Sequence, residues 1–247
     1  MVSKAIKNNY LRVLAFSGPD GTGKTTCAKI VSEFLSAKGY YTIRTWVKTT
    51  HSIAFVIIAL LEKINPKHVV RSTSGTFVTS SMTRYRKVWL WMEFAGILLK
   101  ILSIKAHSLM VKLGARKSIL IADRYLLDSM VHITLSLMLA KIGNNLSLCD
   151  LVNSLPFKIL RSFLLRSTLT IFLDGEIPVL LKRNIMVNKA DPHGYMVLQR
   201  RIYKELVRML RVPFVYIDTT EKSLSEVCSE VLVILKERGE SKNLAIQ

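Results

Sequence analysis

A phosphate-binding motif lies near the start of the chain. The residues Gly18-Pro-Asp-Gly-Thr-Gly-Lys-Thr25 match the pattern G-x-x-x-x-G-K-[ST]. Glycines allow successive backbone N–H groups to turn toward one anion, and the lysine and threonine add an ammonium group and a hydroxyl. Lys24 is therefore a candidate ligand for the β- and γ-phosphates of a nucleotide, and Thr25 is a candidate ligand for Mg²⁺.

The segments on both sides of this motif have the patterns that such a loop requires. The apolar run Leu11–Phe16 is typical of a buried strand, and Thr25–Leu35 has the apolar spacing of an amphipathic helix. A helix N-terminus adds its positive dipole end to an anion site. Strand, loop and helix in this order predict a working phosphate site rather than a glycine-rich turn without a ligand.

Aspartates follow three further predicted strands. Asp123, Asp174 and Asp218 each come directly after an apolar run, so we expect them at the same edge of a parallel sheet. Asp123 precedes Arg124, and a carboxylate beside an arginine can hold Mg²⁺ and clamp a phosphoryl group in transfer. The alternative is that Asp123 only caps the helix that follows it.

The order of the elements predicts an α/β fold in a single domain. Apolar runs alternate with helical patterns, which indicates a parallel sheet with helices on both faces. The polar segment Lys67–Ser80 has the composition of a surface loop, and Met82–Leu113 has that of a long helix, bent or broken. We expect five strands, at residues 11–16, 41–46, 119–122, 169–173 and 214–217.

The composition favours an anionic ligand. The chain has 247 residues and a net charge of +19, with 36 basic residues against 17 acidic ones. The basic residues are spread along the chain, which favours a solvated basic surface and an anionic small substrate; binding of nucleic acid or of an acidic membrane stays open. The widely spaced Cys27, Cys149 and Cys228 predict a reducing, cytoplasmic location.

The most apolar segment is Val88–Leu102, which Glu93 and Lys100 interrupt. It is shorter than the roughly 20 apolar residues of a membrane-spanning helix. We therefore expect a buried helix, and a helix lying on a membrane surface is the alternative.

Several motifs together resemble those of the thymidylate kinase family of nucleoside monophosphate kinases. They are Gly18–Thr26 with an aspartate inside the loop, Asp123-Arg124-Tyr125 followed by Asp128-Ser129, Phe172-Leu173-Asp174, Leu181-Lys182-Arg183, and Ile217-Asp218. Their order and spacing extend over nearly the whole chain. The resemblance implies a three-layer P-loop kinase fold, with a phosphate loop at 18–26, an acceptor-side helical region at about 47–117 and a short lid at about 183–195.

The resemblance also implies an activity. ATP and Mg²⁺ would be the cofactors, and the γ-phosphate would pass to a nucleoside monophosphate, with dTMP converted to dTDP. Asp20 would face the acceptor, Arg124 would bridge the two sets of phosphates, and Thr25 and Asp123 would hold the metal. The implied catalytic residues are Asp20, Lys24, Asp123, Arg124 and Arg183. The implied donor-binding residues are Gly18, Asp20, Gly21, Thr22, Gly23, Lys24, Thr25, Thr26, Arg183 and Thr219.

The lid is expected to supply one further catalytic cation. Family members that have glycine after the loop aspartate, as this chain has Gly21, take this cation from the lid, where Arg183 and Lys189 are available. Backbone atoms near Asp218-Thr219-Thr220 would lie beside adenine. By the same resemblance, the long helical region could form a homodimer interface.

The acceptor side departs from the family pattern. The family usually has Arg-Glu-Pro-Gly-Gly after the second strand, whereas this chain has Arg44-Thr-Trp-Val-Lys-Thr-Thr-His51. The candidate acceptor-binding residues are Asp20, Trp46, Lys48, Arg84, Tyr85 and Arg124. One alternative is therefore a P-loop kinase that acts on another small acceptor than dTMP. A second alternative is that the protein is not a metabolic kinase but a nucleotide-dependent protein that binds nucleic acid or an acidic membrane surface.

Overall fold

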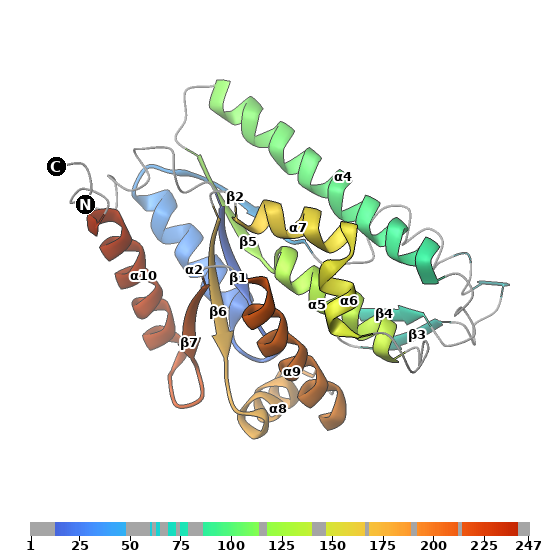
Figure 1. Ribbon diagram of the computed structural model, residues 1–247. Coiled ribbons are helices and arrows are strands. Elements are labelled where there is room, and N and C mark those ends of the chain that lie inside the picture. The colour runs from blue at the N-terminus through green and yellow to red at the C-terminus, as the bar shows by residue number, and fades with distance from the viewer. Residues whose placement is uncertain are drawn as a thin grey trace.

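A five-stranded parallel sheet forms the centre of the fold, in the order β2-β5-β1-β6-β7 (Figure 1). The computed structural model describes residues 13–47, 60, 63–64, 69–72, 75–78, 86–113, 118–139, 147–165, 168–188, 192–211 and 214–241. The sheet contains β1 (Val13–Ser17), β2 (Tyr41–Thr45), β5 (Ser118–Asp123), β6 (Thr168–Asp174) and β7 (Phe214–Asp218). The five predicted strands are confirmed, and β1, which leads into the phosphate loop, is the central strand.

Helices cover both faces of the sheet (Figure 1). On one face, α2 (Lys24–Ala37) and α10 (Leu224–Ser241) enclose a core that includes Leu14, Phe16 and Ile121. The core on the other face includes Phe157, Phe172 and Tyr203. The helices of this second face are α4 (Arg86–Leu113), α5 (Leu126–Leu139), α6 (Leu148–Asn153), α7 (Leu155–Leu165), α8 (Ile177–Met186) and α9 (His193–Leu210). The predicted three-layer architecture is therefore confirmed.

Two expectations for the region between β2 and β5 were wrong. The segment Lys67–Ser80, expected to be a loop, contains the antiparallel strands β3 (Val69–Ser72) and β4 (Gly75–Val78). Its many Ser, Thr and Gly residues obscured two short β-branched runs, which pair with each other rather than with the main sheet. The long helical region was expected to be bent or broken, and the broken form is wrong, because α4 is continuous over 28 residues.

The apolar segment within α4 is buried on one side only. Phe94, Ile97 and Ile101 belong to the core, whereas Trp91 and Leu102 are about half exposed. Among the described residues, no helix has the length and apolarity that crossing a membrane requires.

A buried carboxylate ties α9 to the sheet. Asp174, at the end of β6, is fully buried and accepts hydrogen bonds from Arg200 Nε (2.7 Å) and the Tyr216 hydroxyl (3.0 Å). Lys204 Nζ lies 3.2 Å from the same carboxylate. Burial alone would raise the pKa of Asp174, but the hydrogen bonds from Arg200 outweigh it and hold that pKa below its ordinary value.

We predict that Asp174→Asn lowers the free energy of unfolding by about 1–3 kcal/mol at neutral pH, because a charged acceptor is lost. Since the folded-state pKa lies below the unfolded value, the carboxylate stabilises the fold above about pH 4 and loses this contribution as the pH falls further. Urea unfolding of both proteins from pH 7 to pH 3.5 measures this. A difference that stays constant below pH 4 would contradict the assignment.

Candidate functional site

The phosphate loop is packed closely against its surroundings. Gly18 has φ +142°, and a Cβ there would overlap the carbonyl of Leu173 on β6. Gly21 has φ +87°, and a Cβ there would lie 2.8 Å from the carbonyl oxygen of Leu180 on α8. The loop therefore needs glycine at both positions for conformation and for space.

A buried ion pair joins the loop to the end of β5. Arg124 donates from its guanidinium to Asp20 Oδ1, and both side chains are almost buried. Arg124 itself has φ +68°; its N–H donates to Phe16 O (2.9 Å) and its carbonyl accepts from Val47 N–H (3.1 Å). Burial opposes the charged form of Arg124, but the attraction of Asp20 outweighs it and raises the pKa of Arg124. The left-handed backbone of this non-glycine residue is held by a neighbour on β1 and by one just after β2.

Lys24 begins helix α2 beside this pair. Its ammonium group donates to Pro19 O, and Nζ lies 3.3 Å from Thr22 Oγ1 and 3.9 Å from Asp20 Oδ1. Burial, together with the nearby positive charge of Arg124, lowers the pKa of Lys24 to about 8. Lys24 and Arg124 therefore lie close together in a small buried volume, balanced by the nearby carboxylates of Asp20, Asp123 and Asp128. Two cationic groups so placed suit phosphate oxygens.

The predicted metal ligands suit a hard cation. Asp123 lies opposite Phe16 in the parallel register, and its Oδ1 is buried without a hydrogen bond to any described residue. Thr25 is exposed in the first turn of α2. A buried carboxylate oxygen that lacks a donor and an exposed threonine hydroxyl are ligand types that fit Mg²⁺, which keeps several waters and uses few protein ligands. Within the described ranges, no group of three or more His, Cys, Asp or Glu side chains could hold a metal by itself.

The other two strand-end aspartates have different partners. Asp174 pairs with α9, as described above, and Asp218 accepts from the N–H (2.9 Å) and hydroxyl (2.5 Å) of Thr220. Hydrogen bonds from Thr220 lower the pKa of Asp218. Of the three carboxylates, Asp123 is therefore the one suited to a metal beside the loop.

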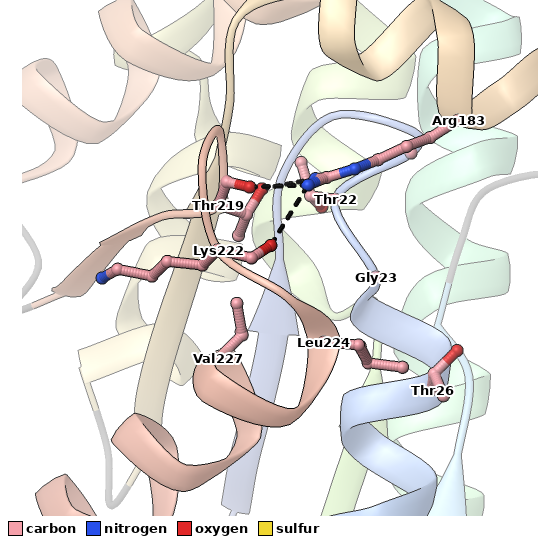
Figure 2. Close-up of a pocket in the computed structure, with 9 residues that line it drawn as sticks. Thr22, Gly23, Thr26, Arg183, Thr219, Lys222, Leu224 and Val227 are labelled. Carbon is pink, nitrogen blue, oxygen red and sulfur yellow. Dashed lines mark hydrogen bonds between the residues drawn. The ribbon is translucent and has the colours of Figure 1, made fainter.

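A pocket of about 200 Å³ opens between the loop and the segment after β7 (Figure 2). Arg183 enters it from α8 and donates to Thr219 Oγ1 (3.1 Å), Thr219 O (2.8 Å) and Lys222 O (3.3 Å). These bonds hold its guanidinium at the wall of the pocket (Figure 2). The lining residues are Gly21, Thr22, Gly23, Thr26, Arg183, Thr219, Lys222, Leu224 and Val227. The catalytic role expected of Arg183 stays a prediction, and Lys189 lies outside the described residues.

The acceptor side is described in part. Trp46 is about half exposed at the end of β2, next to Val47, whose N–H bonds to the Arg124 carbonyl. Trp46 therefore lies on the Arg124 side of the loop. Lys48, Arg84 and Tyr85, the other candidates, lie outside the described residues.

Sequence reasoning missed the contribution of helix α9. Gln199 and Tyr203 are buried, Gln199 bonds to Asp20, and Tyr203 donates to Asp128 Oδ1 (2.7 Å). The spacing of four residues between Tyr195, Gln199 and Tyr203 could have predicted a polar stripe on the buried face of this helix.

Comparison with known proteins supports the fold assignment. No protein-family model and no curated protein sequence matches this chain. Among solved structures, a thymidylate kinase from Candida albicans matches with a TM-score of 0.60 and 17% identity, over 93% of each chain. The chain has the fold of a nucleoside monophosphate kinase. A deoxyadenosine kinase from M. mycoides with bound dCTP also matches, with a TM-score of 0.49 and 17% identity, over 91% of this chain and 99% of that one.

We predict that Gly21→Ala destabilises the protein more than Gly39→Ala does. Both glycines have a positive φ, but a Cβ at Gly39 would meet nothing within 4 Å, whereas at Gly21 it would press on Leu180. The conformational cost of about 1–2 kcal/mol is common to both variants, so the difference isolates the close approach of α8 to the loop. Chemical denaturation measures it, and equal destabilisation would refute that close packing.

Proposed function

We propose that this protein is an ATP- and Mg²⁺-dependent phosphotransferase that acts on a nucleoside monophosphate, with dTMP converted to dTDP. The observation that carries the proposal is the convergence of Lys24, Asp20 and Arg124 at the end of the central strand. The fold it shares with a thymidylate kinase supports the same class of reaction.

The residues present suit phosphoryl transfer. An oxygen of the acceptor phosphate attacks the γ-phosphorus, the bond to the β–γ bridging oxygen breaks, and ADP leaves. This transition state spreads negative charge over several oxygens, so the protein contributes position and positive charge. Lys24 would approach the donor phosphates from α2, and Arg124 would reach both donor and acceptor. Mg²⁺, held by Thr25 and Asp123, would neutralise charge on the donor phosphates.

Arg124 must change partners for this role. In the present structure its guanidinium is bonded to Asp20, and Lys24 bonds to Pro19 O and lies near Thr22. Phosphate oxygens would take over these donors, which would leave Asp20 Oδ1 available to the acceptor. Without anionic ligands, the two cations are therefore bonded to oxygen atoms of the loop.

A coupled assay with ATP, Mg²⁺ and a panel of nucleoside monophosphates and nucleosides tests the proposal. We expect turnover of dTMP above the other acceptors. Preference for another monophosphate or nucleoside would support the alternative of a P-loop kinase with a different small acceptor. No turnover of any compound would overturn the proposed reaction.

Lys24→Ala and Arg124→Ala should separate the roles of the two cations. We expect each to lower kcat by about 100- to 1,000-fold, because each supplies charge to the transition state. Arg124→Ala should leave ATP affinity nearly unchanged, whereas Lys24→Ala should weaken it. Lys29→Ala is the matched control, since Lys29 is an exposed lysine of the same helix. Equal turnover in parent and Lys24→Ala would contradict the assignment.

We further propose that α4 forms a homodimer interface. Its outer side carries large apolar side chains that are about half exposed or more: Trp91, Leu99, Leu102, Leu109 and Met110. Trp91, Leu102 and Leu109 lie on one face of the helix, and an apolar stripe of this length on a surface marks an interaction site. A second copy would cover it symmetrically.

We also propose that the protein is cytoplasmic.

The double variant Leu102→Glu, Leu109→Glu should convert a dimer to a monomer in light scattering, since charges would enter an apolar interface. Val233→Glu, at a half-exposed position of α10, is the control and should stay dimeric. A monomeric parent would contradict the dimer. In that case binding to oligonucleotides and acidic vesicles at low and moderate salt tests the alternative partners, because phosphate contacts weaken steeply with salt.

A further inference from the structure

Helix α9 presents a polar stripe to the candidate site. Tyr195, Gln199 and Tyr203 follow each other at intervals of four residues, so they lie one above another on one face. All three are buried, and Gln199 is only 3% exposed. Buried polar side chains are costly unless they are hydrogen-bonded, so their partners matter.

Gln199 bonds to the phosphate loop through both ends of its amide. Its Oε1 accepts from the Asp20 N–H at 3.3 Å, and its Nε2 donates to Asp20 Oδ2 at 3.4 Å. Nε2 also lies 3.5 Å from the Tyr195 hydroxyl. A carboxamide is suited to this because it has an acceptor and a donor side by side. Each bond is longer than the usual 2.9–3.0 Å, so the pair together, rather than either bond alone, defines the orientation of Asp20.

The division of the carboxylate oxygens shows what this orientation achieves. Gln199 occupies Oδ2, while Oδ1 faces Arg124 and, at 3.9 Å, the ammonium group of Lys24. A rotated Asp20 side chain would exchange these oxygens or move both away from the cations. The amide of Gln199 therefore determines which face of the carboxylate meets the charged groups.

Tyr203 holds the other partner of the ion pair from the same helix. Its hydroxyl donates to Asp128 Oδ1, and Asp128 Oδ2 accepts from the Tyr125 N–H at 3.1 Å. Tyr125 directly follows Arg124, so this bond positions the turn in which Arg124 has its left-handed backbone. Helix α9 thus contacts Asp20 directly and is linked to the Arg124 turn through Asp128.

We propose that Gln199 is a positioning residue for phosphoryl transfer, which orients Asp20 for the acceptor and couples the placement of α9 to that orientation. This inference rests on the function proposed above. Gln199 is part of α9, so a shift of this helix would move the amide that contacts Asp20. The donor pocket is lined by Arg183 and Thr219 and not by Gln199. Loss of Gln199 should therefore affect the acceptor rather than ATP.

Three variants test the proposal. Gln199→Leu removes both hydrogen bonds at similar volume, and we expect kcat/KM for the acceptor to fall by up to about 100-fold, as for a misplaced catalytic group. ATP affinity, measured by calorimetry, should change less than threefold. Arg201→Leu is the matched control, because Arg201 is 74% exposed on the same helix and pairs only with Glu205 in the described part of the chain.

The variant Gln199→Glu tests the pH dependence of kcat/KM for the acceptor, which a purely structural role of Gln199 would leave unchanged. In its protonated form the introduced carboxyl group would reproduce the amide, accepting from the Asp20 N–H and donating to Oδ2. In its ionised form it would repel the Asp20 carboxylate. The Tyr195 hydroxyl also lies against position 199, and Lys24 and Arg124 face the same Asp20 carboxylate from its other side. We expect the acceptor kcat/KM of Gln199→Glu to approach the parent value at pH 6 and to fall below it at pH 8.5.

The free energy of unfolding of Gln199→Glu can be measured over the same pH range without any enzymatic activity. This measurement therefore separates the positioning role of Gln199 from the proposed function. Its stability relative to the parent should increase toward pH 6, because repulsion raises the folded-state pKa of the carboxyl pair above the unfolded values. A parent protein that turned over no acceptor, while the stability of Gln199→Glu still depended on pH in this way, would contradict the proposed function. That result would support the contact of Gln199 with Asp20. The positioning role would be overturned if the kcat/KM and stability of Gln199→Glu relative to the parent did not depend on pH. It would also be overturned if Gln199→Leu had the kinetics of the parent.

Discussion

The buried ion pair between Asp20 and Arg124 is the contact on which the site depends. It joins the loop after the central strand to the turn after β5, segments that are 104 residues apart in the chain. Two buried charges are costly unless geometry and further hydrogen bonds satisfy them. Here Lys24, Gln199 and the left-handed backbone of Arg124 all contribute to that geometry. The contacts that satisfy this pair therefore bring together the loop, the end of strand β5 and helix α9.

The same crowding explains the form of the phosphate loop. Carbonyls of β6 and α8 approach Gly18 and Gly21 so closely that no side chain fits between them. The loop backbone is consequently held by packing on one side, while the first turn of α2 stays exposed at Thr25 and Thr26. A loop whose backbone is already held in this way loses little conformational entropy when it binds phosphate.

Local patterns predicted most of the fold. The inner strands β1, β5 and β6 were recognisable because a parallel strand covered on both faces is apolar throughout, whereas the edge strand β2 was recognisable from its alternating pattern. The β3–β4 hairpin was missed because its strands are short and rich in Ser, Thr and Gly. The continuity of α4 was also missed. Its apolar residues extend over both the buried and the exposed sides, so no single stripe defined its course.

The sequence alone determined the phosphate loop, because its chemistry lies in consecutive residues whose backbone conformation depends on glycine. It also indicated Asp123 and Arg124, since the ends of parallel strands meet at one edge of a sheet. Only the tertiary structure decided how these groups pair. Arg183 bonds to Thr219 and Lys222, Asp174 pairs with α9, and Gln199 holds Asp20 across 179 residues of sequence. Such contacts depend on how helices pack on the sheet, which residue spacing within one segment does not specify.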